Sequence, residues 1–479
     1  MNNLSTRTLW WLLLGILGVR LMSLGLYPLM DTSEARYAEM ARKMLELGDW
    51  VTPMFDYGVP FWGKPPLAFW TQALGMQLLG INEFAVRLPA WLLHVASCLL
   101  LIRFAREEYD ERIGLVAAIL FSSSSLGLLA AGVVLTDPAL GFAIVLACYG
   151  FWRGTVHADR AWALAGFFGL GLGLLAKGPL ALVLVGAQAG LWTLWNRQWR
   201  ALLALPWFSG LGLMLLVAVP WYVIAELRSP GFLDYFLVGE HWKRYVVSDW
   251  GGDLYGSAHE RPPASIWLDL LMALFPWSLL LPLLYRVYRP TGDKCLALSF
   301  ITLWALTTPL FFTLSGNILW TYVLPALPAW GLLLALALRA HLNVPDKLVA
   351  GVALALPLGL MAAVLDGGLF ERPQNQQALA RAWSSLQATD PAPLYYWGRR
   401  SYAGEFYSAG QARRVKTLGE LPERGGFYLA RREKDLDQDR AQLQPLGCEE
   451  RLRASQSVLF KCSGAASRPL TLATPPTPG

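Results

Sequence analysis

The stretch TLWWLLLGILGVRLMSLGLYPLMDTSEARYAEMARKMLELGDW, residues 8–50, decides the fold class of this chain. Its first part, residues 8–30, is a long apolar run, and the remainder carries charges of both signs at short intervals. A helix needs about 20 apolar residues to cross a hydrocarbon core roughly 30 Å thick. The run is longer than the apolar region of a signal peptide and has no A-x-A-like cleavage site after it, so we predict a retained first transmembrane helix.

The composition of the whole chain extends this prediction. Of its 479 residues, 55% are hydrophobic and 15% are charged, against about 45–50% and about 25% in soluble domains. Apolar runs recur as far as residue 365. We therefore predict a polytopic α-helical membrane protein of about 11–13 transmembrane helices, with candidate spans at residues 8–30, 84–105, 113–135, 139–152, 161–176, 179–195, 202–225, 265–285, 295–314, 318–338 and 348–365.

The basic residues predict the orientation, because short cytoplasmic loops are enriched in Lys and Arg. Alternate connections carry them, so these connections and the N-terminus are predicted to be cytoplasmic: Arg103, Arg106 and Arg112, then Arg153 and Arg160, Arg197 and Arg200, Arg286, Arg289 and Lys294, and Arg339 and Lys347. Residues 65–80 are too short for a comfortable span, and we interpret them as an amphipathic helix at the membrane surface. The net charge of +6 fits membrane orientation better than nucleic-acid binding.

The domain prediction follows from the change of composition near residue 366. Residues 1–365 form a transmembrane domain with periplasmic loops at 31–83 and 226–263, residues 366–468 a small periplasmic α/β domain, and residues 469–479 a disordered tail. Residues 375–388 have helical spacing, and residues 392–397, 425–430 and 457–462 resemble strands. Cys448 and Cys462 form a disulfide if this domain faces an oxidising compartment, while Cys98, Cys148 and Cys295 belong to apolar helices.

Three polar side chains next to apolar runs are candidates for chemistry. Asp137, in LTDP, is either a functional carboxylate or a helix N-cap followed by Pro138. Lys177, in LAKGP, either extends toward the membrane interface or binds a phosphate; the glycines before it lack the ending of a phosphate-binding loop and favour close helix packing. Lys64, in WGKPP, either anchors the interface with its aromatic neighbours or holds a lipid phosphate.

The order of several motifs resembles one family. DTSEARYAEMARKML, FWGKPPLAFW, LTDP, LAKGPLAL, YFLVGEHWKRY, LFPW and FFTLSGNILWTYVLPALPAW follow one another between residues 26 and 330. Together they resemble bacterial polyprenyl-phosphate-sugar-dependent glycosyltransferases of the C-type fold, in particular the aminoarabinose lipid A transferases, which are related to protein O-mannosyltransferases. Many members read D-E-x-R-Y-A-E, whereas this chain has Ser33 in place of the Asp and Asp31 two positions earlier.

The resemblance implies a sugar donor on undecaprenyl phosphate, a cell-envelope acceptor such as lipid A, and an active site facing the periplasm in the inner membrane. It implies that Asp31 or Glu34 is the catalytic base, with Asp137 as a second active-site carboxylate. It places the donor phosphate near Lys64, Arg36, Lys177, His241, Arg244 and Tyr322, supported by Glu240. Family members can show a bound divalent cation, but nothing in this sequence requires a metal or another cofactor.

Two alternatives compete with this prediction. One is a protein O-glycosyltransferase or another envelope-glycan transferase. The other is a flippase or transporter of lipid-linked sugars, which would concentrate its polar groups near the middle of the bilayer. Here the concentrated polar features fall on one predicted face, which favours an enzyme that uses a base to activate the acceptor hydroxyl and cations to stabilise the departing phosphate.

Overall fold

The computed structural model describes residues 4–247, 250–256, 261–286, 294–340, 346–422 and 425–464. The chain divides into two compact units. The helical unit comprises Met1–Leu26 and Met40–Leu365, and the sheet unit comprises Tyr27–Glu39 and Asp366–Gly479. The boundary at residue 365 coincides with the predicted one, but the segment Tyr27–Glu39 groups with the C-terminal residues, and helix α2 (Ser33–Leu47) continues across the division.

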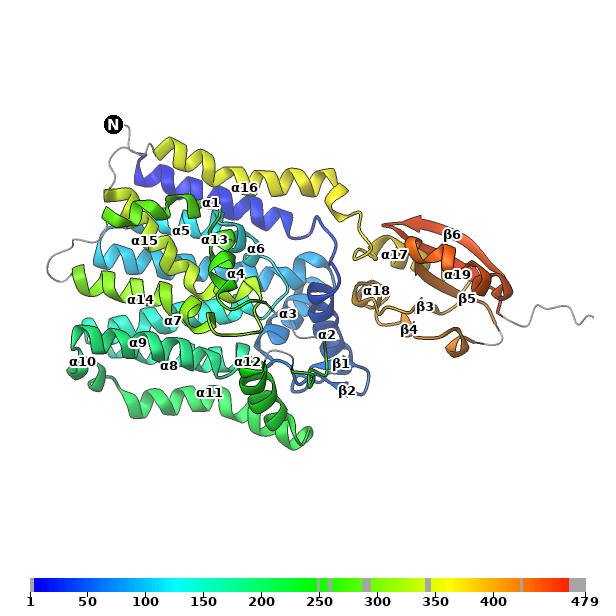
Figure 1. Ribbon diagram of the computed structural model, residues 1–479, viewed down its shortest axis with the longest axis horizontal. Helices are drawn as coiled ribbons and strands as arrows, with labels where there is room; N and C mark the ends of the chain where they lie inside the picture. Colours follow the sequence, from blue (N-terminus) through cyan, green and yellow to red (C-terminus); the bar gives the residue numbers. More distant parts are fainter. Residues whose placement is uncertain are drawn as a thin grey trace, which may run out of the picture. The chain divides into compact units, whose positions relative to one another are not determined.

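The helical unit is built almost entirely from helices (Figure 1). Besides part of α2 and the short antiparallel pair β1 (Met54–Asp56) and β2 (Val59–Pro60), it contains α1 (Thr6–Ser23), α3 (Leu67–Leu79), α4 (Glu83–Glu108), α5 (Glu111–Ser123), α6 (Ser125–Ala130), α7 (Asp137–Val156), α8 (Arg160–Lys177), α9 (Leu180–Asn196), α10 (Trp199–Leu203), α11 (Trp207–Arg228), η1 (Asp234–Lys243), α12 (Arg244–Val246), α13 (Ser265–Leu274), η2 (Trp277–Arg286), α14 (Lys294–Phe312), η3 (Trp320–Ala326), α15 (Leu327–Ala340) and α16 (Asp346–Asp366).

Six helices in the described part of the chain are long and apolar enough to cross a membrane, and seven if α13 and η2, bent by 107°, form one span. The prediction of a polytopic helical membrane protein is confirmed, whereas the count of 11–13 spans stays a prediction. Several predicted spans are interrupted: the one at residues 113–135 breaks at Ser124, which caps α6, and the one at 202–225 breaks at Pro206. The first helix ends at Ser23, before Gly25 and Pro28.

Close packing of helices is made possible by small residues. Helix α8 packs against α7, α9 and α11, and a Cβ on Gly169 would lie 3.0 Å from the backbone of Ala143 in α7. A Cβ on Gly173 would lie 2.5 Å from the Ala181 side chain in α9. The prediction that these glycines serve helix packing is confirmed, since anything larger would separate the backbones.

Helix α3 corrects one sequence-based interpretation. It is a helix, as predicted, and packs its buried face against α4. Its exposed residues include Leu74, Leu78 and Leu79, which are 48%, 72% and 49% exposed. The helix is therefore apolar on its outer side as well, and the amphipathic interpretation was wrong: Gln72 lies buried and does not form part of a polar outer face.

The sheet unit has one five-stranded sheet of order β4-β3-β5-β7-β6. Strands β3, β4 and β5 are parallel, and β5-β7 and β7-β6 are antiparallel. Its elements are α17 (Gln377–Leu386), β3 (Leu394–Trp397), α18 (Tyr402–Tyr407), β4 (Arg413–Val415), β5 (Phe427–Arg432), α19 (Leu436–Leu443), β6 (Cys448–Ala454) and β7 (Ser457–Cys462), with short 3-10 turns between them. The predicted helix and three predicted strands are present as α17, β3, β5 and β7.

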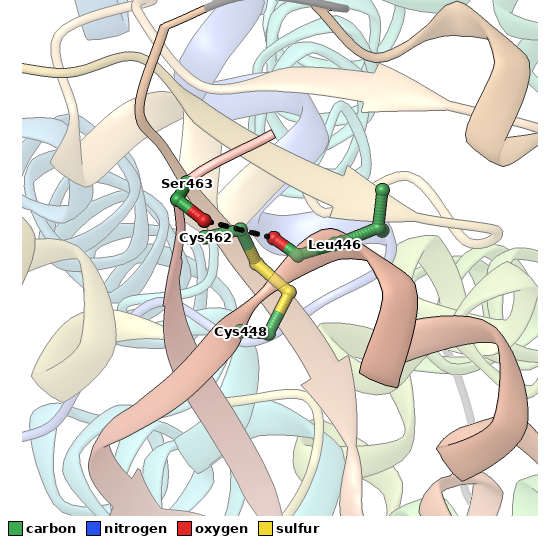
Figure 2. The surroundings of a disulfide bond; sticks show 4 residues. All are labelled: Leu446, Cys448, Cys462 and Ser463. Carbon is green, nitrogen blue, oxygen red and sulfur yellow. Dashed lines mark hydrogen bonds between the residues drawn. A yellow bond between two sulfur atoms is a disulfide. The ribbon is translucent and has the colours of Figure 1, made fainter. Parts of the chain in front are cut away.

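A disulfide joins Cys448 and Cys462, which lie opposite each other in the β6-β7 pair. Figure 2 shows this bond beside the hydrogen bond that the Ser463 hydroxyl donates to the Leu446 carbonyl oxygen (3.5 Å). The predicted pairing of Cys448 with Cys462 is therefore present. Such a bond persists in an oxidising compartment. The predicted disordered tail at 469–479 lies outside the described residues.

Candidate active site

The helical unit contains a cavity of about 390 Å³ that combines three cations with an apolar wall. The cations are Lys64, Lys177 and Arg244. Lys64 precedes α3, Lys177 ends α8, and Arg244 begins α12. The sequence separates these residues widely, and the fold brings them to one space. The other lining residues are Pro179, Leu180, Val183, Leu237, Glu240, His241, Trp242, Tyr245, Phe311, Phe312, Ser315, Asn317 and Tyr322.

Glu240 holds two of the three cations. The Lys64 ammonium donates to Glu240 Oε2 (2.9 Å), and Arg244 Nη1 donates to Oε1 and Oε2 (3.1 and 3.0 Å). The Glu240 side chain is only 3% exposed. Burial by itself raises the pKa of Glu240, but the charges of Lys64 and Arg244 outweigh burial and place the pKa below its ordinary value. Arg244 also lies 3.4 Å from Asp253.

Asp137 holds the third cation. The Lys177 ammonium donates to Asp137 Oδ1 (2.7 Å), and both side chains are about nine-tenths buried. The ammonium also lies 4.5 Å from the centroid of the Tyr322 ring, a cation–π distance. The N-cap interpretation of Asp137 was wrong: α7 begins at Asp137 itself, Thr136 is its N-cap, and no side chain caps the helix there. The carboxylate is used instead to fix Lys177.

His241 supports the same corner of the cavity through its ring. Nδ1 lies 2.8 Å from the Phe236 carbonyl oxygen and Nε2 lies 2.9 Å from the Lys177 carbonyl oxygen. Burial lowers the pKa of His241, although the two carbonyl oxygens favour the protonated ring. Because His241 contacts the backbone of Lys177, it connects η1 to the end of α8.

Three features of the cavity were not singled out from the sequence. Asn317 Nδ2 donates to the Arg244 carbonyl oxygen (2.7 Å), and the Tyr245 hydroxyl donates to the Phe311 carbonyl oxygen (2.6 Å). Asp253 adds the second carboxylate near Arg244. Asn317 lies within the quoted motif LSGNILWTY. It carries no charge and has no unusual spacing, so the sequence gives no reason to single it out.

The remaining predicted residues belong to the sheet unit. Asp31 Oδ2 accepts a hydrogen bond from the Ser401 hydroxyl (2.8 Å), and Oδ1 accepts one from the Ala403 amide (2.9 Å). Burial raises the pKa of Asp31 to about 6, against these two hydrogen bonds and the charge of Arg399, which lower it. Glu34, in the first turn of α2, is half-buried, and Arg36 lies 5.3 Å from the centroid of the Tyr37 ring.

The described ranges contain no group of three or more His, Cys, Asp or Glu side chains that could hold a metal ion. The cavity therefore presents no ready set of oxygen ligands for the divalent cation that the sequence resemblance allows, and its charges are balanced by cation–carboxylate pairs. Chemically, the arrangement can hold an anion beside an apolar chain.

The comparisons with known proteins agree with this geometry. Residues 5–236 match the family described as dolichyl-phosphate-mannose-protein mannosyltransferase. The chain also resembles a solved structure, ArnT from Cupriavidus metallidurans bound to undecaprenyl phosphate, with a TM-score of 0.80, 21% sequence identity, and 96% of this chain and 98% of that chain covered. The fold of the chain is that of these C-type glycosyltransferase structures.

The curated proteins that this chain resembles in sequence are aminoarabinose transferases. The chain is 32% identical over 372 residues to the undecaprenyl phosphate-alpha-4-amino-4-deoxy-L-arabinose arabinosyl transferase of Pseudomonas paraeruginosa, a match that covers 76% of this chain and 65% of the relative. It is 33% identical over 370 residues to the protein of the same name from Pseudomonas aeruginosa, with the same two shares covered. The chain thus matches slightly less than two thirds of the length of these relatives. The C-type fold is shared more distantly with the Archaeoglobus fulgidus oligosaccharyltransferase AglB (TM-score 0.51, 11% identity, 97% of this chain and 75% of that chain covered).

Proposed function

We propose that this protein transfers a sugar from undecaprenyl phosphate to an acceptor of the cell envelope, such as lipid A, at the periplasmic face of the inner membrane. The observation that carries the proposal is the cavity in which Lys64, Lys177 and Arg244 face the same space as a wall of Leu, Val, Phe and Trp side chains. A ligand with an anionic head and an apolar tail would match both the cations and the apolar wall of this cavity. The names of the relatives supply the donor class and the sugar class.

The proposed reaction breaks the bond between the anomeric carbon and the phosphate oxygen and forms a bond from that carbon to the acceptor oxygen. Negative charge accumulates on the departing polyprenyl phosphate, and Lys64, Arg244 and Lys177 would stabilise it. Such fixed electrostatic stabilisation is often the largest contribution to catalysis. Glu240 and Asp137 keep the cations in place before the ligand arrives, so little reorganisation is needed during the reaction.

The proposed base is Glu34 or Asp31, and the two hydrogen bonds of Asp31 favour Glu34. Both carboxylate oxygens of Asp31 accept hydrogen bonds within the sheet unit, and using Asp31 as a base would require giving up at least one of them. Glu34 accepts a hydrogen bond from the Met30 amide at 3.5 Å. A base whose proton affinity is matched to the reaction contributes about 10²–10⁴-fold to the rate.

The periplasmic orientation rests on two observations. The segments that line the cavity, near residues 64, 177, 240 and 322, alternate with the Lys- and Arg-rich connections along the chain. The sheet unit carries a disulfide. In a cysteine-free background, an impermeant thiol reagent applied to whole cells should label Glu34→Cys and leave Arg197→Cys unlabelled; the reverse pattern would invert the topology.

The function is tested by reconstituting the purified protein with an undecaprenyl-phosphate sugar and candidate acceptors. Wild type should transfer the sugar, Glu34→Gln should lose about 10²–10⁴-fold of the rate, and Asp31→Asn should keep most of it. A greater loss in Asp31→Asn than in Glu34→Gln would exchange the two assignments. Movement of lipid-linked sugar across the bilayer without transfer to any acceptor would overturn the enzyme and support a transporter.

A further inference from the structure

The sheet unit contains a second cavity, of about 120 Å³, which shares no residue with the cavity of the helical unit. It lies where the parallel strands β3 and β5 end, because most of its lining residues complete or closely follow these strands. The carboxyl ends of parallel strands are a common place for ligands in α/β sheets. The lining residues are Asp31, Pro373, Gln376, Tyr396, Trp397, Arg399, Arg400, Ser401, Ala430, Arg431, Arg432, Lys434, Asp435 and Ser457.

Each of the two parallel strands delivers a pair of arginines to this cavity: Arg399 and Arg400 after β3, and Arg431 and Arg432 at the end of β5. One arginine of each pair has a structural partner. Arg400 Nε donates to Glu405 Oε1 (2.6 Å), and Arg431 Nε donates to Asp439 Oδ2 (2.5 Å). These two ion pairs account for half of the four arginines.

The other arginine of each pair has no carboxylate partner within ion-pair distance among the described residues. Arg399 donates to the Thr32 hydroxyl at 3.3 Å, and the Arg432 side chain makes no hydrogen bond within that part of the chain. Burial and the nearby charge of Arg399 lower the pKa of Arg432. Asp31 and Asp435 act on Arg432 only at longer range. Two like charges that face one space without a carboxylate in ion-pair contact are stabilised by an anionic ligand.

Two buried polar atoms of the lining also lack a partner. Among the residues that the structure describes, the Tyr396 hydroxyl has no hydrogen-bond partner although Tyr396 is only 7% exposed, and Gln376 Oε1 has none although Gln376 is 4% exposed. A buried polar group without a partner is costly, and an absent ligand is one of the few explanations for it. The cavity thus offers a hydroxyl donor and an amide acceptor beside two guanidinium groups that have no carboxylate in ion-pair contact among the described residues.

The carboxylates that line the cavity do not cancel its preference for an anion. Both oxygens of Asp31 are already used by the Ser401 hydroxyl and the Ala403 amide, and Asp435 lies 4.0 Å from Arg431. The five cations among the lining residues therefore outnumber the two carboxylates. The volume admits one tetrahedral anion, since pockets for whole small molecules are typically about 300 Å³ or more.

We propose that this cavity binds a phosphate monoester, held by Arg399 and Arg432 and by the Tyr396 hydroxyl, and that the phosphate is carried by the headgroup of a lipid or glycolipid. A phosphate monoester carries both acceptor oxygens for the cations and, when singly protonated, a donor for Gln376 Oε1. Free inorganic phosphate shares this chemistry and is the competing source. We further assign this phosphate to the acceptor of the sugar. That assignment rests on the proposed transferase function.

Binding is tested on the full-length protein in phosphatidylcholine nanodiscs, with and without phosphatidic acid, by titration with inorganic phosphate. Phosphate should bind the wild type, phosphatidic acid should compete with it, and Arg432→Gln should weaken binding about tenfold or more. Arg413→Gln, which removes an exposed arginine of β4 outside the cavity, is the matched control and should bind as the wild type does. Equal phosphate affinity in Arg432→Gln and wild type would overturn the site.

The variant Tyr396→Phe separates ligand binding from folding. It removes a buried hydroxyl without a partner, so the thermal stability of the ligand-free protein should not fall, whereas phosphate affinity should decrease several-fold. Lower stability with unchanged affinity would mean that the hydroxyl serves the fold, and would overturn its assignment to the ligand. Phosphate binding without competition from phosphatidic acid would overturn the lipid as the source.

Transfer kinetics connect the site to the acceptor. With a phosphorylated acceptor, Arg432→Gln should raise the acceptor KM about tenfold and leave the donor KM and kcat unchanged. An unchanged acceptor KM in a variant that has lost phosphate binding would overturn the acceptor role. Failure of the wild type to transfer any sugar would instead overturn the proposed function and leave the phosphate titration as an independent measure of the site.

Discussion

The two cavities differ in how their cations are balanced. In the helical unit every cation of the cavity has a buried carboxylate partner: Glu240 holds Lys64 and Arg244, and Asp137 holds Lys177. In the sheet unit, Arg400 and Arg431 have such partners, whereas Arg399 and Arg432 have none among the described residues. The first cavity is electrostatically complete without a ligand, and the second is not.

This difference has a physical consequence for each site. Cations fixed by buried carboxylates keep their positions in the ligand-free state, which suits a site that must stabilise charge as it develops. Cations that face each other without a counterion gain most of their stabilisation when an anion arrives, which suits a site whose task is to bind. The predictions below test this contrast.

Among the changes that compare the two cavities, the largest effect is expected at Lys64. Lys64→Ala removes a cation that faces the apolar cavity and leaves Glu240 with Arg244 alone. Sugar transfer should fall by about 10²–10³-fold, the range seen when one fixed donor to a developing negative charge is removed. Measuring kcat/KM with an undecaprenyl-phosphate sugar checks this. Lys347→Ala, on the exposed side of α16, should retain the wild-type rate; a similar loss there would point to a general effect of charge removal.

A somewhat smaller effect, on stability, is expected at Glu240. Glu240→Gln leaves two buried cations without their shared carboxylate, which should lower the free energy of unfolding by about 3 kcal/mol. Undecaprenyl phosphate should restore part of this loss, because its phosphate can occupy the space between the cations. The ligand-induced increase in Tm should therefore be larger for the variant than for the wild type. An equal increase would contradict the view that Glu240 stands in for the ligand's charge.

The sheet unit should show a pH dependence from Asp31. Its pKa, raised to about 6 by burial, lies above the ordinary value near 4, so the folded unit holds a proton that the unfolded chain releases between about pH 4 and pH 6. Asp31 therefore leaves the free energy of unfolding unchanged below about pH 4, lowers it as the pH rises from about 4 to about 6, and has no further effect above that, for a total of about 3 kcal/mol. Hydrogen exchange in β3 and β5 reports the free energy of unfolding of this unit. As the pH rises from 4 to 7, this free energy should increase in Asp31→Asn relative to the wild type. A constant difference over this range would contradict the raised pKa.

The smallest effect is expected at Asp137. Asp137→Asn keeps the shape of the side chain and an acceptor for the Lys177 ammonium, but removes the charge that fixes it. We expect transfer to fall about tenfold, mainly in kcat, because Lys177 is then held less firmly in the ground state. Lys177→Gln in the same background should add little, since the two residues act as a pair. Additive losses would show that Asp137 acts on the reaction by itself.

Much of the sheet unit was predictable, and its missed elements share one property. The three predicted strands correspond to β3, β5 and β7, the central strands of the sheet, whose apolar side chains are buried. The missed strands β4 and β6 are the two edges, with the polar sequences RRV and CEERLRA. Edge strands pair through their backbones on one side and keep charged side chains in water, so no hydrophobic pattern marks them.

The sequence by itself determined that this is a polytopic helical membrane protein, because apolar runs of sufficient length have no other stable environment. It also singled out Lys64 and Lys177, because charges are rare next to such runs, and it singled out Glu240 and Arg244 through the motif that resembles the transferases. Only the tertiary structure decided which charges meet. Asp137 contacts Lys177, 40 residues away, and Glu240 contacts Lys64, 176 residues away. Pairing of this kind depends on helix packing, which local sequence patterns do not encode.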